Sequence, residues 1–302
     1  MTLKCLFLND REPYPEDCFD AIPDLQVAWA QDHRGGFSLE RALAAHPDTE
    51  ILVTTLMDLC AENLALLPRL RLIVTITTGT DYIDKDYCVR HGIVVRNTPG
   101  FTGASVAEHA VALMLAAAKR LKPYDEGVRR GDFQVFEHQS IELAGRTAGI
   151  IGLGTIGSQV ARMLSGFGLR VLFCNRRPRA SDLGTQVRFE RLLTDSDILF
   201  LTLSMSPDAR HLIDARTLAQ VKPGAILINI SPDALIDVDA LHEALQTGRL
   251  SYAGLDLHHQ DRRFLDLPNC ILSPRRAWYT EEAFERRIRI FTQTLAEAIE
   301  IP

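Results

Sequence analysis

The stretch Ala148-Gly149-Ile150-Ile151-Gly152-Leu153-Gly154-Thr155-Ile156-Gly157 decides how the second half of this chain folds. An apolar run leads into three glycines with G-x-G-x-x-G spacing, and a segment of helical periodicity follows directly. The spacing alone is weak evidence, but between a strand and a helix it is typical of a turn that binds the pyrophosphate of a dinucleotide. We therefore expect a dinucleotide site here. The alternative is a glycine-rich turn without a ligand.

The residues of this turn have separate expected tasks. Gly152 permits the tight turn, and Gly154 lets the backbone approach the phosphates. Gly157 lets the helix pack closely on the strand. The main-chain amides of Thr155 and Ile156 open the helix, whose N-terminus favours negative charge. These five residues form the first part of the predicted cofactor site.

On both sides of the turn, short apolar runs alternate with helical patterns, as in parallel sheets covered by helices. Before the turn we expect strands at 4–8, 26–30, 51–54, 72–75 and 93–96. After it we expect strands at 147–152, 170–174, 198–203, 225–230, 252–257 and 270–272. The segments between consecutive strands are long enough for right-handed crossover helices. The sequence thus predicts an α/β protein with two doubly wound parallel sheets.

Helical patterns occur at 38–45, 81–91, 105–121, 156–167, 214–220, 238–247 and 281–299. The last of these follows the second series of strands. We expect it to pack back on the first domain, which would make that domain discontinuous. Asp233 and Asp237 are expected to cap the helix that begins near Val238.

Length and composition narrow the classes of protein. The 302 residues, 46% of them hydrophobic, are enough for two globular domains, and the net charge of -6 argues against nucleic acid as a partner. No stretch reaches the roughly 20 apolar residues of a membrane span, so no membrane partner is expected. The six cysteines have no close pair, which favours reduced thiols in a cytoplasmic protein over disulfides or a metal site.

The end of the strand after the glycine turn indicates which dinucleotide binds. An NAD-binding protein usually places a carboxylate there, about 20 residues on, to bond the ribose hydroxyls. This chain instead has Asn175, Arg176 and Arg177. A guanidinium pairs with a 2′-phosphate, whereas a carboxylate repels it. The sequence therefore favours NADP(H) over NAD(H), unless both arginines are only solvated.

Five segments in order resemble one family. They are Asn97-Thr98-Pro99-Gly100, Val106-Ala107-Glu108-His109, Gly149-Ile150-Ile151-Gly152-Leu153-Gly154, Lys222-Pro223-Gly224-Ala225-Ile226-Leu227-Ile228-Asn229 and Ala253-Gly254-Leu255-Asp256. Over nearly its whole length the chain resembles the D-isomer-specific 2-hydroxyacid dehydrogenases, the group that includes phosphoglycerate, glyoxylate and phosphite dehydrogenases.

The resemblance implies a domain organisation. A flavodoxin-like substrate domain would comprise residues 1–97 and 281–302, and a Rossmann nucleotide-binding domain, residues 98–280, would be inserted in it. A cleft between the two domains would close on the substrate. Dimerisation through the nucleotide-binding domain is usual in the family, so a homodimer is expected.

The resemblance also implies roles for individual residues. Main-chain amides of Thr78, Gly79 and Thr80 would hold the substrate carboxylate. Asp256 would hold the nicotinamide carboxamide, and Ile230 belongs to the expected cofactor site.

The family's catalytic residues are replaced. Pro232 stands where members carry an arginine that grips the substrate's carboxylate and carbonyl. Arg275 stands where members carry a histidine as general acid, and a guanidinium keeps its proton near neutral pH. Asp261 would be the counterpart of the family's glutamate, shorter by one methylene.

Other residues near these positions offer replacement chemistry. An unperturbed imidazole titrates near neutral pH, so His258 and His259 are candidate acid–base groups, although a pair of loop histidines is more often structural. Arg275 is a candidate for the missing cation. With Arg262, Arg263 and Arg276 it would form an anion-binding cluster for a phosphorylated, phosphonate or dicarboxylate substrate; the alternative for Arg262 and Arg263 is a solvated surface.

Three functions remain open from the sequence. The first is an NADP-dependent oxidoreductase that acts on a small anionic 2-hydroxy or 2-keto acid, or on a phosphonate-type substrate, with a rearranged catalytic set. The second is a cofactor-binding enzyme with non-redox or unusual chemistry. The third is an inactive homologue that senses nicotinamide nucleotides. The retained glycines, Asp256 and the loop 77–80 favour the first two.

Overall fold

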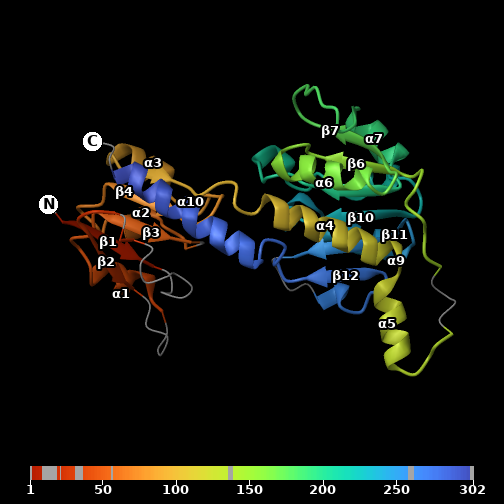
Figure 1. The fold of residues 1–302 in the computed structure, drawn as a ribbon, viewed down its shortest axis with the longest axis horizontal. Helices are drawn as coiled ribbons and strands as arrows, with labels where there is room; N and C mark the ends of the chain where they lie inside the picture. The colour runs from red at the N-terminus through yellow and green to blue at the C-terminus, as the bar shows by residue number, and fades with distance from the viewer. Residues whose placement is uncertain are drawn as a thin grey trace. The chain divides into compact units, whose positions relative to one another are not determined.

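The computed structural model describes residues 2–8, 19–20, 22–30, 37–55, 57–134, 139–257 and 262–299. It divides the chain into two compact units. One comprises Met1–Phe101 and Thr280–Pro302, and the other comprises Thr102–Tyr279. Both are α/β units with an all-parallel sheet, which confirms the predicted fold class (Figure 1).

The first unit is built on a five-stranded sheet of order β2-β1-β3-β4-β5, the order of flavodoxin-like folds. Its strands are β1 (Leu3–Phe7), β2 (Leu25–Trp29), β3 (Ile51–Thr54), β4 (Leu72–Thr75) and β5 (Val94–Arg96). Its helices are α1 (Leu39–Ala44), α2 (Ala61–Leu64), α3 (Lys85–Arg90) and α10 (Glu281–Ile299).

Alternate residues of these strands fill two separate cores. Phe7, Val53 and Val74 pack against Phe291 and Leu295 of α10. Leu6, Leu52 and Ile73, one position away in the same strands, form a second core with residues of α1, α2 and α3. These helix residues include Leu43, Leu64 and Cys88. The expectation that the last helix packs on the first sheet is therefore confirmed, and α10 is seen along that sheet in Figure 1.

The second unit is built on a seven-stranded sheet of order β12-β11-β10-β9-β6-β7-β8. Its strands are β6 (Thr147–Ile151), β7 (Arg170–Cys174), β8 (Thr185–Gln186), β9 (Ile198–Leu201), β10 (Ala225–Asn229), β11 (Leu250–Asp256) and β12 (Cys270–Ser273). Its helices are α4 (Gly103–Ala118), α5 (Leu121–Arg129), α6 (Thr155–Ser165), α7 (Phe189–Asp195), α8 (Ala215–Gln220) and α9 (Val238–Gln246). The chain order reverses between β6 and β9, the switch point at which Rossmann folds bind dinucleotides.

Helices cover both faces of this sheet. One face packs α4 and α6 against residues such as Ile150, Phe200 and Ile228. The other packs α7, α8 and α9 against residues such as Ile151, Leu199 and Leu227. Strands buried on both faces explain the continuous apolar runs in the sequence. The same packing ties the glycine turn at the end of β6 to a rigid support.

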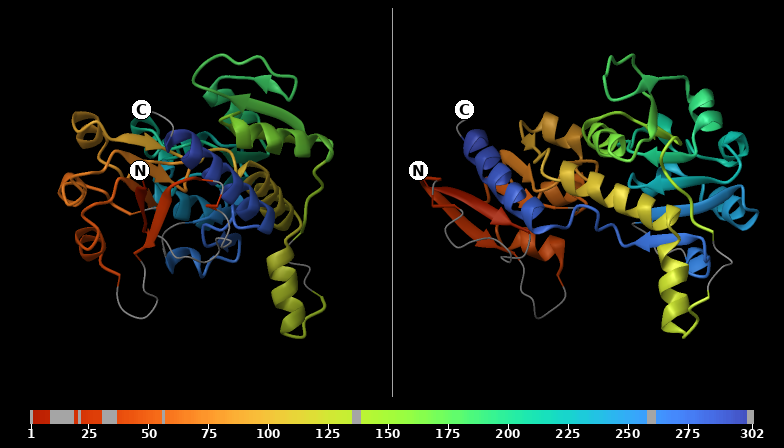
Figure 2. Two further views of the ribbon diagram at one scale, coloured as in Figure 1. Left: turned by 60° about the vertical axis from the view of Figure 1, so that its left-hand side comes forward. Right: turned by 45° about the vertical axis from the view of Figure 1, so that its right-hand side comes forward.

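Two helix predictions need correction. The helix expected at 105–121 ends at Ala118, because Arg120 adopts a left-handed backbone with φ of 54° and a separate helix, α5, starts at Leu121. Figure 2 shows α5 projecting from its unit. The helix expected at 81–91 begins at Lys85, because the Asp84 carboxylate caps it by accepting from the Tyr87 N–H at 2.8 Å.

One of the two expected caps of α9 is confirmed. Asp237 accepts hydrogen bonds from the N–H groups of Asp239 and Ala240. The prediction for Asp233 was wrong, because Asp233 starts a separate short 3-10 segment, Asp233–Leu235, ahead of the cap. Two further 3-10 segments are Pro207–Ala209 and Arg262–Phe264.

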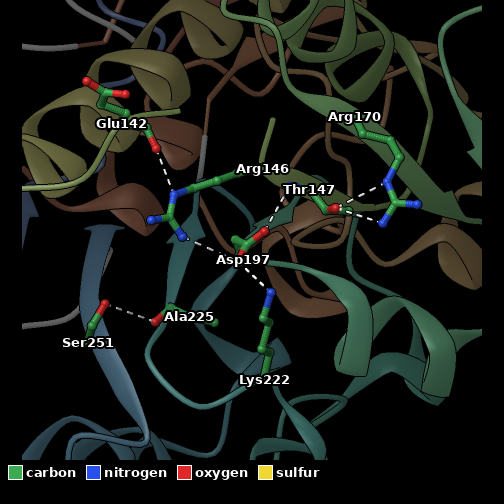
Figure 3. Close-up of polar contacts among 8 residues, drawn as sticks. All are labelled: Glu142, Arg146, Thr147, Arg170, Asp197, Lys222, Ala225 and Ser251. Atoms are coloured by element: carbon green, nitrogen blue, oxygen red, sulfur yellow. Dashed lines mark hydrogen bonds and ion pairs between the residues drawn. The ribbon is translucent and has the colours of Figure 1, made fainter. Parts of the chain in front are cut away.

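A partly buried carboxylate joins three strands at their amino-terminal ends (Figure 3). Asp197, just before β9, accepts from the Thr147 N–H at 2.9 Å and from the Lys222 ammonium at 2.7 Å. Arg146 lies 3.5 Å away, and the Asp197 side chain is only 14% exposed. Burial alone would raise the pKa of Asp197, but the hydrogen bonds from Lys222 and Thr147 and the nearby positive charges outweigh burial and lower it.

We predict that Asp197→Asn lowers the free energy of unfolding at pH 7 by about 1–3 kcal/mol, because the Thr147 N–H and the Lys222 ammonium lose a charged acceptor. A carboxylate whose pKa is lowered by folding stabilises above its unfolded pKa and loses this contribution as the pH falls through the folded value. The gap between wild type and variant should therefore narrow below about pH 4 in urea titrations. As the control, Asp195→Asn removes an ion pair with Arg191 on the surface of α7 and should have little effect. Equal losses at both positions would contradict the prediction.

Candidate active site

The turn after β6 has the geometry that dinucleotide turns require. Gly152 has φ of +99°, and a Cβ there would lie 2.5 Å from Leu203 Cδ2. A Cβ on Gly157 would lie 2.3 Å from the carbonyl oxygen of Gly152. A Cβ on Gly154 would meet nothing within 4 Å, so the backbone there faces open space. The helix α6 begins immediately afterwards at Thr155, with its N-terminus at the open side of the turn.

The segment after β7 holds this turn in place. The Asn175 Oδ1 accepts from the Leu153 N–H at 2.7 Å, and the Arg179 guanidinium donates to the Leu153 carbonyl. The Gly152 N–H donates to the Cys174 carbonyl at 3.0 Å. Asn175, a predicted cofactor residue, therefore has a defined contact with the turn itself. Sequence reasoning missed Arg179, although it is the third arginine within four residues of the chain.

A pocket of about 920 Å³ opens beside the end of β7. Its lining includes Ile151, Cys174, Asn175, Arg176, Val187, Leu203, Ser204 and Leu212. The mixture of an apolar floor and polar rim, next to the second strand of a Rossmann unit, suits the adenosine half of a dinucleotide. Burial raises the pKa of Cys174 to about 11, so its thiol stays protonated and contributes packing rather than reactivity.

An adjoining pocket of about 510 Å³ is lined by residues 175–179, which include three arginines. Arg177 is exposed. The Arg176 guanidinium lies 3.6 Å from the Asp208 carboxylate, with side chains 78% and 86% exposed. An ion pair this exposed is worth little, so Arg176 can exchange Asp208 for a phosphate. The pocket can therefore accept an anion.

Asp256, at the end of β11, is a buried carboxylate that is 2% exposed. Its Oδ1 accepts from the Ser273 hydroxyl at 2.7 Å and from the Arg276 N–H at 2.9 Å. Its Oδ2 accepts from the Ala277 N–H at 3.1 Å. Ser273, which sequence reasoning missed, is placed beside Asp256 by the parallel register of β11 and β12. The only sequence signal for it was its place directly before Pro274.

Arg275 reaches the loop that follows β10. Its guanidinium donates to the Ser231 carbonyl at 2.9 Å, directly before Pro232, and its backbone is left-handed with φ of 54°. The structure thus brings a cation to the position where the chain carries a proline. Ile230, just before Ser231, is 7% exposed and packs in the core on the α4 and α6 face.

In the first unit, the loop after β4 is held by side chains. The Thr77 hydroxyl donates to the Gly79 carbonyl at 2.8 Å and lies 2.6 Å from the Tyr82 hydroxyl. The Asn97 amide donates to the Thr78 carbonyl at 2.6 Å. Thr78 and Gly79 are exposed and Thr80 is half-buried, so the loop is shaped by its neighbours while its main chain remains accessible.

The remaining predicted site residues have separate outcomes. His258, His259 and Asp261 lie outside the described residues. Arg263 pairs with Asp239 at the surface and Arg262 is exposed, as their alternative role as solvated residues required. Arg276 lies over the Tyr279 ring at 5.0 Å. Of the four arginines of the expected cluster, Arg275 is the one with a described hydrogen bond to the loop after β10.

Among the described residues, no three His, Cys, Asp or Glu side chains gather as they would around a metal ion. Every helix in the described part of the chain is too short or too polar to traverse a lipid bilayer. The five described cysteines are free thiols.

Comparison with known proteins places the chain. The family model for the D-isomer specific 2-hydroxyacid dehydrogenase, NAD binding domain, matches residues 111–277. The chain is 36% identical to the glycerate dehydrogenase of Methylorubrum extorquens over 249 residues, 78% of each protein. It is 36% identical to the glyoxylate reductase of Korarchaeum cryptofilum over 262 residues, 82% of this chain and 79% of that protein. A solved structure of an acyclic imino acid reductase in complex with NADPH and D-Arg is 28% identical, with a TM-score of 0.88 over 98% of this chain and 97% of that one.

The chain therefore belongs to the D-isomer-specific 2-hydroxyacid dehydrogenase family. Like the relatives named as dehydrogenases and reductases, it is an NAD(P)-dependent oxidoreductase. This outcome supports the oxidoreductase class of the first function that the sequence left open.

We predict that two glycine substitutions in the turn affect different properties, one the thermal stability and the other nucleotide binding. Gly157→Ala should lower the melting temperature, because its Cβ meets backbone at 2.3 Å and the backbone cannot move aside cheaply. Gly154→Ala should leave the melting temperature nearly unchanged, because its Cβ enters open space, yet weaken nucleotide binding by filling the approach to the phosphates. Thermal unfolding and fluorescence titration with NADPH measure both effects. Unchanged nucleotide affinity in folded Gly154→Ala would contradict the assignment of the turn.

Proposed function

We propose that this protein is an NADP(H)-preferring oxidoreductase that acts on a small anionic 2-hydroxy or 2-keto acid, or on a phosphonate-type substrate, with Arg275 as its substrate-binding cation. The observation that carries the proposal is the 2.9 Å contact from the Arg275 guanidinium to the Ser231 carbonyl. The contact uses one of the five N–H donors of a guanidinium. It leaves the positive charge of Arg275 next to Pro232, whose own side chain carries no charge.

The arginine pocket supports the choice of cofactor. Arg176, Arg177 and Arg179 line it, and the usual carboxylate at the end of the second strand is replaced by Asn175. A 2′-phosphate would gain charge-assisted hydrogen bonds there, whereas NAD(H) would leave the guanidiniums to water. Residues of the glycine turn would hold the pyrophosphate and Asp256 the carboxamide. When bound, the cofactor would supply the hydride, and the chain would supply orientation and charge.

The remaining features of the proposal rest on the sequence. The main-chain amides of Thr78, Gly79 and Thr80 are proposed to take the substrate carboxylate. His258, His259 and Asp261 stay predicted acid–base groups. The homodimer and the cytoplasmic location stay predictions as well.

We expect Arg177→Ala to weaken NADPH binding by about tenfold or more and to leave NADH binding within twofold, since a charge-assisted hydrogen bond to phosphate is worth about 1.5–3 kcal/mol. Fluorescence titration of the purified protein with each nucleotide measures this. Arg162→Ala removes an exposed arginine of α6 outside both pockets and is the charge-matched control. Equal affinity of the wild type for NADPH and NADH would argue against the NADP preference.

The role of Arg275 is tested by kinetics. Arg275→Ala should raise the KM of the anionic substrate by about 10- to 100-fold, as loss of a charged hydrogen-bond donor does, with NADPH affinity unchanged. Arg276→Ala, at the neighbouring exposed arginine over Tyr279, is the matched control and should change KM little. The substrate is first found by following NADPH oxidation against a panel of 2-keto acids, phosphonates and phosphorylated acids. A larger effect at position 276 than at 275 would refute the assignment.

A second candidate is reduction of a 2-imino acid, the reaction for which one similar solved structure is named. Reduction of a carbonyl leaves an oxyanion that must take a proton, and an arginine keeps its proton near neutral pH. A protonated imine carries its proton already, so hydride addition yields a neutral amine without a further donor. Arg275 therefore suits this substrate without a separate acid.

The two candidates are separated by one comparison. If NADPH oxidation with a 2-keto acid requires added ammonia or an amine, the imine is the substrate. If it proceeds equally without amine, the keto acid is. In the first case Pro232→Arg combined with Arg275→His, which restores the family's residue types, should shift the preference towards the amine-free reaction.

A further inference from the structure

A line of three side chains runs from α4 to the buried carboxylate of β11. The His109 Nε2 lies 2.8 Å from the Ser273 Oγ, and the Ser273 hydroxyl donates to Asp256 Oδ1 at 2.7 Å. The proposed function uses only Asp256 of these three. His109 lies on an apolar helix, yet it is half-buried and hydrogen-bonded to a polar group.

The direction of these hydrogen bonds follows from chemistry. A carboxylate only accepts, so the single Ser273 proton goes to Asp256. The Ser273 oxygen must then accept from His109, which requires a proton on Nε2. Neutral His109 in this tautomer and protonated His109 both meet the requirement, so the line keeps one direction in either charge state. In both states His109 donates to Ser273, and Ser273 donates to the Asp256 carboxylate.

Close packing brings the line together. The helix α4 packs on β11 and β12. A Cβ on Gly254 would lie only 2.9 Å from the Cβ of Leu113, so the glycine lets the helix approach β11 closely. His109 lies one helical turn before Leu113, and Asp256 lies two residues after Gly254 on the same face of the strand. The geometry that seats the helix therefore also sets the reach of His109.

Asp256 retains capacity for a ligand. A carboxylate has about four acceptor positions, and Asp256 uses three of them for Ser273, Arg276 N–H and Ala277 N–H. We infer that His109 is a positioning residue for the nicotinamide carboxamide: through Ser273 it fixes the Asp256 carboxylate so that the remaining acceptor position takes the carboxamide NH₂. The inference rests on the proposed function, because that function places the carboxamide at Asp256.

The test compares two nucleotides that differ only at the carboxamide. The first is NADPH; the second is the reduced 3-acetylpyridine analogue of NADPH, in which a methyl replaces the NH₂. His109→Leu should weaken NADPH binding about five- to tenfold, as loss of one supporting hydrogen bond does, and leave binding of the analogue within twofold. His109→Gln, which keeps a side-chain N–H donor, should recover part of the loss. Affinities are read by fluorescence, without turnover.

A second pair of variants guards against loss of folding in the first. Ser273→Ala removes the hydroxyl and should behave like His109→Leu, whereas Ser273→Thr keeps the hydroxyl and should behave like the wild type. Equal weakening of both nucleotides, or no weakening of NADPH binding in either deletion variant, would overturn the inference while leaving the proposed function standing. A wild type that binds neither nucleotide would overturn the proposed function and the inference with it.

Discussion

The start of α6 and the end of β6 approach each other so closely that there is no room for a side chain at position 157. The arrangement of the second unit around the glycine turn depends on this contact. The carbonyl of Gly152 lies where a Cβ on residue 157 would have to be, at 2.3 Å. Backbone cannot rotate out of the way as a side chain does, so the contact sets the start of α6 against the end of β6. The Thr202 hydroxyl from the end of β9 donates to the same carbonyl at 2.7 Å and helps to hold it in place. The open face of the turn at Gly154 and the position of the α6 N-terminus follow from this one approach.

Strands and helices that are determined by neighbouring residues could be predicted from the sequence. The strand at Arg170–Cys174 and the helix at Glu281–Ile299 have the bounds that the pattern of apolar residues predicted, because burial on a sheet or helix repeats over neighbouring residues. The glycine turn was predictable because its requirements are those of the backbone itself. The break between α4 and α5 was not. The Arg120 guanidinium lies 4.7 Å from the Tyr252 ring, a contact from a distant strand that no local pattern contains.

In the candidate site, too, single residues could be predicted from the sequence, whereas their contacts could not. The resemblance pointed to Asp256 and Arg275 one at a time, but their partners come from strand register and loop packing. Ser273 lies opposite Asp256 because β11 and β12 pair in that register. Arg275 meets the Ser231 carbonyl because the chain leaving β12 turns through a left-handed residue. A non-glycine residue held in that conformation costs of order 1–3 kcal/mol, which the surrounding contacts must offset. Such a distribution of charge is decided by tertiary structure, and spacing in the sequence carries no trace of it.

The two edges of the seven-stranded sheet are stabilised separately. At the amino-terminal edge, the partly buried Asp197 carboxylate ties neighbouring strands through Thr147 and Lys222. The turn and the loops that carry Arg275 lie at the carboxyl edge. Residues far apart with no shared partners contribute to stability nearly additively. Substitutions in the loops can therefore accumulate without weakening the ties at the opposite edge. A scaffold of this kind can change its chemistry over evolutionary time while its fold persists, which gives a physical reason why one family can keep its sheet and exchange its catalytic residues.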